Sequence, residues 1–131
     1  RFHVAKLNRP TSKKSALTRW LTKDYISKNP KIYKELYLML ESNNNKNFLK
    51  SYELFAHYND DDDMIKKINV NTLITTGEHD IRSTPEMARN LNKVIKNSKF
   101  VEIKKGKHLC SIECADDVNI TFKEFIDNNN A

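Results

Sequence analysis

Hydrophobic positions in the first half of the chain recur every three to four residues, the spacing of a helix with one apolar face. Asn29-Pro30 and the polar run Asn43–Asn45 separate the helical segments, because Pro and clustered turn residues end helices. A run of aspartates, Asp60–Asp63, is expected to cap a short helix, since it lacks the spaced ligands and central Gly of a calcium-binding EF-hand. The predicted helices are residues 15–28, with Thr11 or Ser12 as the cap, then 31–42, 46–57 and 64–68.

The second half of the chain alternates short β-rich runs with amphipathic helices. Residues 70–76 predict a buried strand ending at Gly77, and residues 99–104 predict a second strand followed by Gly106. Helices are predicted at 86–95, with Pro85 in the first turn, and from about 117 to 126. This strand–helix–strand–helix order predicts an α/β fold with two parallel strands. Because a two-stranded parallel sheet is not stable alone, we expect more of the sheet to lie outside these residues.

Charge is unevenly distributed along the chain, which carries a formal net charge of +6. Residues 1–31 hold nine Lys or Arg and one acid, whereas the rest holds 14 Lys or Arg and 16 acids. This basic segment suggests nucleic acid, an anionic membrane or an anionic small substrate as a partner. We expect an ordinary lysine-rich surface instead, because no basic patch interleaved with aromatics occurs. For this reason nucleic acid is not expected as a partner. No apolar run approaches the ~20 residues that span a bilayer, and no membrane partner is expected.

Two cysteines, Cys110 and Cys114, make a disulfide framework improbable and favour a reducing, cytoplasmic location. Together with His108 they suggest a zinc site, but structural zinc takes four ligands with paired short spacings, and no second pair exists. No metal is therefore expected. Neither cysteine is expected to be a nucleophile, because both are predicted to pack under the last helix.

Candidate catalytic residues follow the two predicted strands. Asp80 comes after the first strand and His108 after the second, and the carboxyl ends of neighbouring parallel strands meet at one sheet edge. A carboxylate that accepts from one imidazole nitrogen leaves the other free to deprotonate a nucleophile. The order acid then histidine agrees with the Ser…Asp…His order of α/β-hydrolases. His79 is predicted to point away from Asp80 as a surface residue, as alternate side chains of an extended loop do.

Three stretches resemble the α/β-hydrolase superfamily. Residues 71–83 (NTLITTGEHDIRS) with Thr84-Pro85 resemble its penultimate strand and acid loop, and residues 106–126 (GKHLCSIECADDVNITFKEFI) resemble its histidine loop and last helix. The element Arg19-Trp20-Leu21-Thr22 resembles the helical cap of 3-oxoadipate enol-lactonase-like hydrolases, with Leu21 in place of an aromatic residue. The resemblance implies an incomplete α/β-hydrolase: a helical cap region at residues 1–68, then the last two strands and helices of the core at 69–131.

The resemblance also implies site roles. Asp80 is expected to be the triad acid and His108 the general base, with Arg19 and Trp20 binding substrate from the cap. The strained Gly-x-Ser-x-Gly elbow that carries the nucleophile is missing, because neither of the two glycines flanks such a serine. Since the elbow precedes the cap in this family and residue 1 is Arg rather than Met, we expect a fragment that is inactive alone.

The expected parent is a cofactor-independent serine hydrolase of a carboxylic ester or lactone, such as 3-oxoadipate enol-lactone. Haloperoxidase or C–C hydrolase chemistry stays open, because a fold does not determine a function. The expected partners are a small-molecule ester or lactone and either the missing N-terminal half of the core or a second copy of the chain. The main alternative is a non-catalytic interaction module that pairs with a partner chain through an exposed sheet edge. A weaker alternative is nucleic-acid binding through residues 1–31.

Overall fold

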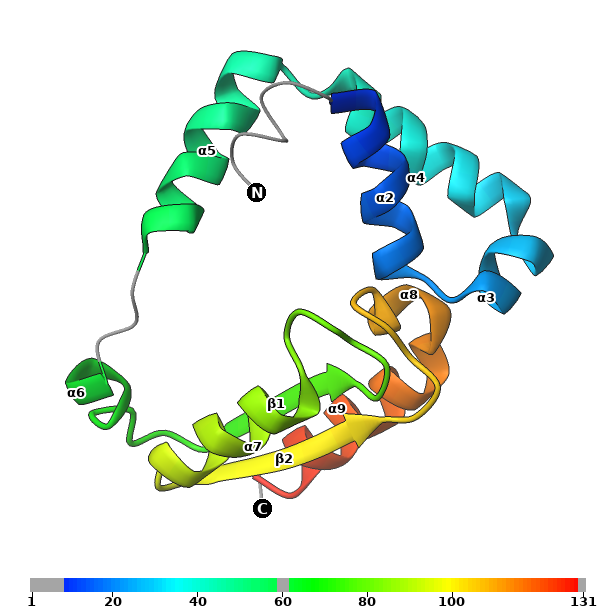
Figure 1. Ribbon diagram of the computed structural model, residues 1–131. Helices are drawn as coiled ribbons and strands as arrows, with labels where there is room; N and C mark the ends of the chain where they lie inside the picture. The colour runs from blue at the N-terminus through cyan, green and yellow to red at the C-terminus, as the bar shows by residue number, and fades with distance from the viewer. Residues whose placement is uncertain (1–8, 59–61, 130–131) are drawn as a thin grey trace. The chain divides into compact units, whose positions relative to one another are not determined.

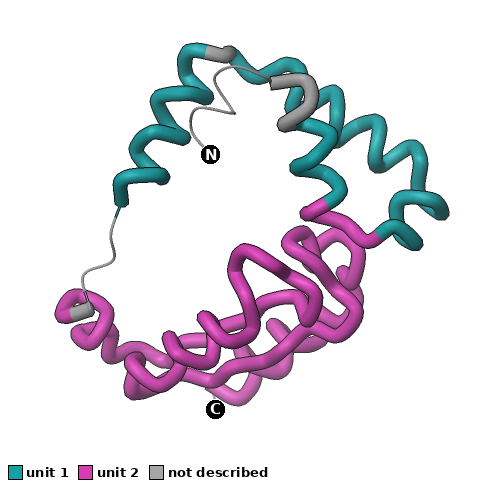
Figure 2. The backbone as a smooth tube through the Cα atoms, viewed as in Figure 1, with its two compact units in different colours: residues 1–18, 23–60 teal, residues 19–22, 61–131 magenta. Residues whose placement is uncertain are grey.

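The computed structural model describes residues 9–58 and 62–129, which fall into two compact units (Figure 1 and Figure 2). Unit 1 comprises residues 1–18 and 23–60, and unit 2 comprises residues 19–22 and 61–131. Both strands belong to unit 2, so the loops of Asp80 and His108 lie in one unit, together with the segment 19–22. The domain boundary predicted between residues 68 and 69 stays a prediction.

The first half of the chain is helical. Its elements are α2 (Arg9–Trp20), α3 (Lys23–Lys28), α4 (Pro30–Ser42) and α5 (Asn45–His57). Pro30 is the first residue of α4, where its missing N–H has no helical partner to lose, so the predicted stop at Asn29-Pro30 is confirmed. Asn44 caps α5, because its side chain accepts a hydrogen bond from the backbone N–H of Asn47 at 3.1 Å.

Two predictions for the first helix were wrong. The helix begins at Arg9, so Thr11 and Ser12 lie inside it and not before its first residue. The single helix predicted for residues 15–28 is two helices, α2 and α3, interrupted at Leu21 and Thr22. Local periodicity continues through this break, and its physical cause is a contact with a distant part of the chain, described below.

The second half alternates strands and helices as predicted. Its elements are α6 (Asp62–Ile65), β1 (Thr72–Gly77), α7 (Pro85–Val94), β2 (Ser98–Ile103), α8 (Cys110–Glu113) and α9 (Ala115–Asp127). α6 begins earlier than predicted, α9 is longer, and the short helix α8 was not predicted. The aspartates at 60 and 61 lie outside the described residues.

The two strands form a parallel pair, with Thr72 opposite Ser98 and Gly77 opposite Ile103. α7 contacts both strands and α9 contacts β2, and Figure 1 shows these helices alongside the sheet. In register, both strands end at the same edge. The parallel pairing that the strand–helix–strand–helix order predicted is therefore confirmed, and it brings the two candidate loops together.

The apolar core of the described residues is small. Unit 2 buries Leu21, Ile74, Ile95, Ile103 and Val118, and Leu17 is buried in unit 1. Other positions on the predicted apolar faces stay open: Phe55 of α5 is 79% exposed, and Ile126 of α9 is 55% exposed. The periodic pattern therefore predicted the helices correctly but overestimated how much of their apolar faces this chain covers.

Candidate active site

Asp80 is held in a tight turn directly after β1. Its side chain is only 3% exposed, and its backbone N–H donates to the carbonyl of Gly77 at 3.0 Å. The carboxylate oxygen Oδ1 accepts from the backbone N–H groups of Arg82 at 2.7 Å and Ser83 at 3.1 Å. These bonds satisfy one oxygen of a buried carboxylate and leave the other, Oδ2, aimed at the loop after β2.

His108 contacts that second oxygen, Oδ2 of Asp80. Its Nδ1 lies 2.7 Å from Oδ2 of Asp80, within hydrogen-bond reach. Because an ionised carboxylate only accepts hydrogen bonds, Nδ1 must be the donor, and in the neutral ring Nε2 is then an acceptor. The His108 side chain is 41% exposed whereas that of Asp80 is 3% exposed. Nε2 of His108 is therefore available as a base, and the hydrogen bond from Nδ1 to Asp80 sets the orientation of the ring.

Trp20 lies against the same imidazole. The indole and imidazole rings are stacked, with centroids 6.4 Å apart and an angle of 29° between their planes. The backbone N–H of Leu109 donates to the carbonyl of Trp20 at 2.9 Å, which joins the end of α2 to the histidine loop. Arg19 precedes Trp20 in the same segment and is half-buried. The structure thus brings three of the four predicted site residues together, and the substrate-binding roles of Arg19 and Trp20 stay predictions.

Close backbone approach at Gly77 aligns the two loops. A Cβ atom on Gly77 would collide with the carbonyl oxygen of Lys107 and would lie 2.5 Å from that of Gly106. The backbone N–H of His79 donates to the Gly106 carbonyl at 2.8 Å, across this contact. Only glycine at position 77 permits this spacing, since any side chain would push the loops of Asp80 and His108 apart. The His79 side chain is exposed, as predicted.

Glu78 secures the turn that follows β2. Its Oε2 accepts from the backbone N–H of Lys105 at 2.9 Å, and its Oε1 lies 3.3 Å from the ammonium nitrogen of Lys104. The Lys105 backbone hydrogen bond, followed by the interaction with Lys104, holds the pKa of the Glu78 carboxyl below its ordinary value. Lys105 itself has φ 62°, a left-handed conformation that side chains rarely adopt, so the turn needs such support.

Cys110 and Cys114 lie beside Gly106, which precedes His108 in the histidine loop. A Cβ atom on Gly106 would lie 2.7 Å from Cβ of Cys110 and 3.3 Å from Sγ of Cys114. Burial raises the pKa of both thiols, which disfavours the reactive thiolate. Among residues 9–58 and 62–129, no group of three His, Cys, Asp or Glu side chains is arranged to hold a metal ion.

Sequence reasoning missed Glu113, whose carboxylate links the segment of Trp20 to the loop of His108. It lies five residues after His108, at the end of α8, and its partner Thr22 is 91 residues away. A local pattern cannot reveal such a contact. The only sequence signal is an acidic residue shortly after the histidine.

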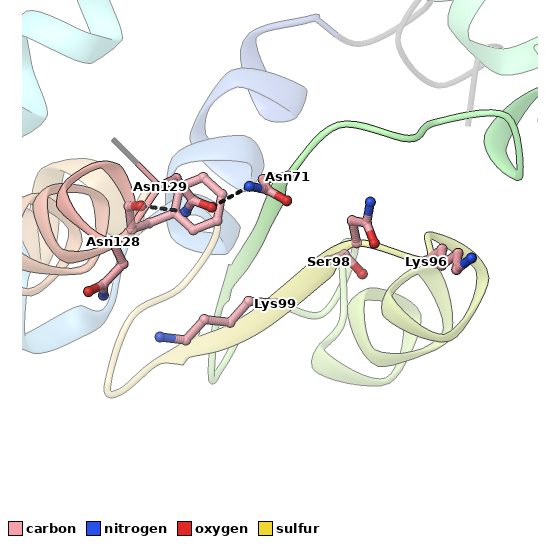
Figure 3. Close-up of a pocket in the computed structure, with 8 residues that line it drawn as sticks. Asn71, Lys96, Ser98, Lys99, Asn128 and Asn129 are labelled. Carbon is pink, nitrogen blue, oxygen red and sulfur yellow. Dashed lines mark hydrogen bonds between the residues drawn. The ribbon is translucent and has the colours of Figure 1, made fainter. Parts of the chain in front are cut away.

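A polar pocket of about 310 Å³ lies elsewhere, where the two strands begin (Figure 3). It is lined by Asn71, Ser98, Lys99 and Asn128 among others, and a hydrogen bond from Asn71 to Asn129 crosses it. Neither Asp80 nor His108 lines this pocket. This pocket is therefore separate from the candidate site, which is identified by its chemistry.

Comparison with known proteins gives the fold. No family model matches the sequence, and no curated protein matches it. Among solved structures, the enol-lactonase from Burkholderia xenovorans matches with a TM-score of 0.87 and 24% identity, over 95% of this chain and 48% of that chain. A thermophilic esterase from Thermogutta terrifontis matches with a TM-score of 0.85 and 19% identity, over 98% and 47%. A bromoperoxidase from Bacillus anthracis matches with a TM-score of 0.82 and 21% identity, over 95% and 46%.

These matches are all α/β-hydrolases, so they confirm the predicted fold, and the chain spans about half the length of each matched structure. At these identities the matches establish the fold and not the reaction.

Proposed function

We propose that this chain, which has the fold of the cap and C-terminal core of an α/β-hydrolase, supplies the acid and base of a serine hydrolase acting on a carboxylic ester or lactone. The observation that carries the proposal is the 2.7 Å contact between Asp80 Oδ2 and His108 Nδ1 at the carboxyl ends of two parallel strands. The serine nucleophile and the oxyanion-hole donors lie outside these 131 residues. The matched enol-lactonase and esterase support the choice of substrate class.

Asp80 and His108 divide the proton chemistry between them. Nε2 of His108 takes the proton of the attacking serine hydroxyl, and the ring becomes an imidazolium whose Nδ1–H points at Asp80. The buried carboxylate stabilises this charge without taking the proton itself. His108 then donates the proton to the leaving oxygen, and in the second half it activates the water that releases the acyl group. No cofactor is needed for either step.

The cap segment would shape the acyl side of the pocket. Trp20 is stacked on the His108 ring, with the ring centroids 6.4 Å apart, and would offer an apolar wall to a substrate. Arg19, next to it in sequence, carries a planar guanidinium group, which pairs with a carboxylate through two parallel hydrogen bonds. We therefore propose an ester or lactone that carries a carboxylate, of the 3-oxoadipate enol-lactone type, as the preferred substrate.

The alternative of a non-catalytic interaction module rests on a different observation. The described sheet has two strands, and the helices beside it expose apolar side chains such as Phe122, which is 46% exposed. Such surfaces favour a partner, either the rest of the core or a second copy. Within the described residues, no helix is long and apolar enough to cross a membrane. A cytoplasmic location remains part of the proposal.

Ester turnover tests the proposal. The purified 131-residue chain should hydrolyse p-nitrophenyl acetate at the background rate. A polypeptide in which an α/β-hydrolase N-terminal half with a Gly-x-Ser-x-Gly elbow precedes this chain should turn it over. Asp80→Asn should lower kcat by about 10⁴-fold, since it imposes the wrong imidazole tautomer.

The exposed neighbour His79 provides the matched control, because His79→Ala removes an imidazole next to Asp80 without touching the pair. It should leave turnover unchanged. The proposal fails if the joined protein is folded and active but keeps its kcat after His108→Ala. It also fails if the 131-residue chain alone turns over ester and loses this activity on His108→Ala.

A further inference from the structure

The carboxylate of Glu113 joins two parts of unit 2 that are far apart in sequence. Its Oε2 accepts from both the backbone N–H and the side-chain hydroxyl of Thr22, each at 2.9 Å. Its Oε1 accepts from the backbone N–H of Lys107 at 2.5 Å. One half-buried side chain thus receives three hydrogen bonds, and bonds to an ionised acceptor are among the stronger ones in proteins.

Both sequence neighbours of His108 are hydrogen-bonded, directly or through Glu113, to the segment 19–22. Lys107 precedes His108 and donates to Glu113, and Leu109 follows it and donates to the carbonyl of Trp20. The short helix α8 holds Glu113 at a set distance from the histidine loop. The segment that carries Trp20 is therefore attached immediately before and immediately after the residue on which its indole stacks.

The same bonds explain why α2 stops at Trp20. In a continuous helix the carbonyl of residue 20 would accept from the N–H of residue 24, and the N–H of residue 22 would donate to the carbonyl of residue 18. Instead the Trp20 carbonyl accepts from Leu109, and the Thr22 N–H donates to Glu113. The chain leaves the helix at the point where it is bound to the histidine loop.

We propose that Glu113 is a positioning residue, which holds the segment 19–22 on the histidine loop and so keeps the Trp20 indole over the His108 imidazole. With Asp80 bonded to Nδ1 and the indole on one face, the ring is restrained about both of the torsions that would turn it away. The contact itself needs no ester chemistry, whereas its value for catalysis rests on the proposed function. No substrate contact is assigned to Glu113.

Tryptophan fluorescence measures this contact directly, because Trp20 is the only tryptophan in the chain. A protonated imidazole is a cation that interacts with an indole face and quenches its emission at contact. The emission of the full chain should therefore fall when the pH is lowered far enough to protonate the His108 imidazole, and His108→Gln should abolish the fall.

Glu113→Gln tests the role of the carboxylate. The amide keeps the size of the side chain but replaces one acceptor oxygen by an NH₂ donor, so it cannot serve both Thr22 and Lys107. Most of the pH-dependent quenching should be lost, while the far-UV circular dichroism stays that of the parent chain. Glu124→Gln is the matched control, because Glu124 is an exposed acid of α9, and it should keep the full quenching.

Unchanged quenching in folded Glu113→Gln would overturn the proposal. If Glu113→Gln does not fold, Thr22→Val decides, because it removes one of the three donors and keeps the backbone N–H. It should lose part of the quenching, and full quenching in Thr22→Val would overturn the proposal. Since no ester is involved, this outcome is independent of whether the chain takes part in ester hydrolysis.

Discussion

At the scale of single residues, the two oxygens of Asp80 carry out different tasks. Oδ1 accepts two backbone N–H groups of its own turn, and Oδ2 faces Nδ1 of His108. Aspartate commonly forms such turns, which is the ordinary reading of this residue in a sequence. Here the hydrogen bonds of the turn hold the carboxylate so that Oδ2 points at the imidazole. One residue therefore serves both the local structure and the candidate chemistry.

Gly77 is the residue whose substitution should separate the two loops. A methyl group at this position meets backbone carbonyl oxygens of Gly106 and Lys107, which cannot rotate away as a side chain would. We expect Gly77→Ala to lower the free energy of unfolding by about 1–3 kcal/mol, the usual cost of overpacking. Urea unfolding followed by circular dichroism measures this change.

The exposed strand residue Lys99 supplies a control for Gly77→Ala. Lys99→Ala should change the free energy of unfolding by no more than about 0.5 kcal/mol, as surface substitutions usually do. An unchanged midpoint in Gly77→Ala would mean that the loops do not approach each other as closely as the structure shows.

At the scale of elements, the sequence predicted most of what is local. The strands, α4, α5 and α7 follow from apolar spacing with signals such as Pro30 and Pro85, each of which lies in the first turn of a helix. The break between α2 and α3 could not be predicted, since apolar spacing continues across Leu21 and the contacts that end the helix come from Leu109 and Glu113, far away in the sequence. That Asp80 and His108 lie close together could be predicted because neighbouring parallel strands bring their carboxyl ends together, a rule of topology that sequence order reveals.

Protonation of the Glu78 carboxylate in acid should lower the free energy of unfolding, because this carboxylate supports the turn after β2. The pKa of this carboxyl in the folded chain is below the ordinary value of 4.5, chiefly because Lys105 donates its backbone N–H. A lowered pKa stabilises the fold above the unfolded-state value, and this contribution is lost as the pH falls through the folded-state value. Glu78→Gln should therefore be less stable than the parent above about pH 5, and the difference should shrink at lower pH.

Thermal unfolding of the parent and of Glu78→Gln at several pH values measures this difference. Glu86→Gln, at an exposed position of α7, is the control variant. A gap between parent and Glu78→Gln that stays constant from neutral to acid pH would contradict the assignment of the turn's support to the ionised Glu78.

At the scale of the whole chain, several large apolar side chains of the described residues are exposed. Leu54, Phe55 and Tyr58 are each at least 66% exposed, and α9 leaves Ile120 57% exposed. Groups of exposed large apolar side chains are typical of surfaces on which another surface packs. This agrees with a chain that spans about half the length of the solved structures it matches.

The purified chain should therefore bind the dye ANS and elute with a mass above that of its monomer. Apolar surface that nothing covers binds such dyes and associates in water. Light scattering coupled to size exclusion, with dye fluorescence on the same sample, measures both properties. A monomer that does not bind the dye would disfavour both an orphaned half of a larger core and an edge-pairing module.

The tautomer of His108 tests the central claim most directly, and it can be measured on the chain as it stands. Proton–nitrogen correlation spectra of the labelled imidazole distinguish a proton on Nδ1 from one on Nε2. If Asp80 orients His108 as a general base, the neutral ring should carry its proton on Nδ1, and Asp80→Asn should shift the population toward Nε2–H. A parent chain whose neutral His108 is protonated on Nε2, or averages between the two forms, would contradict the account.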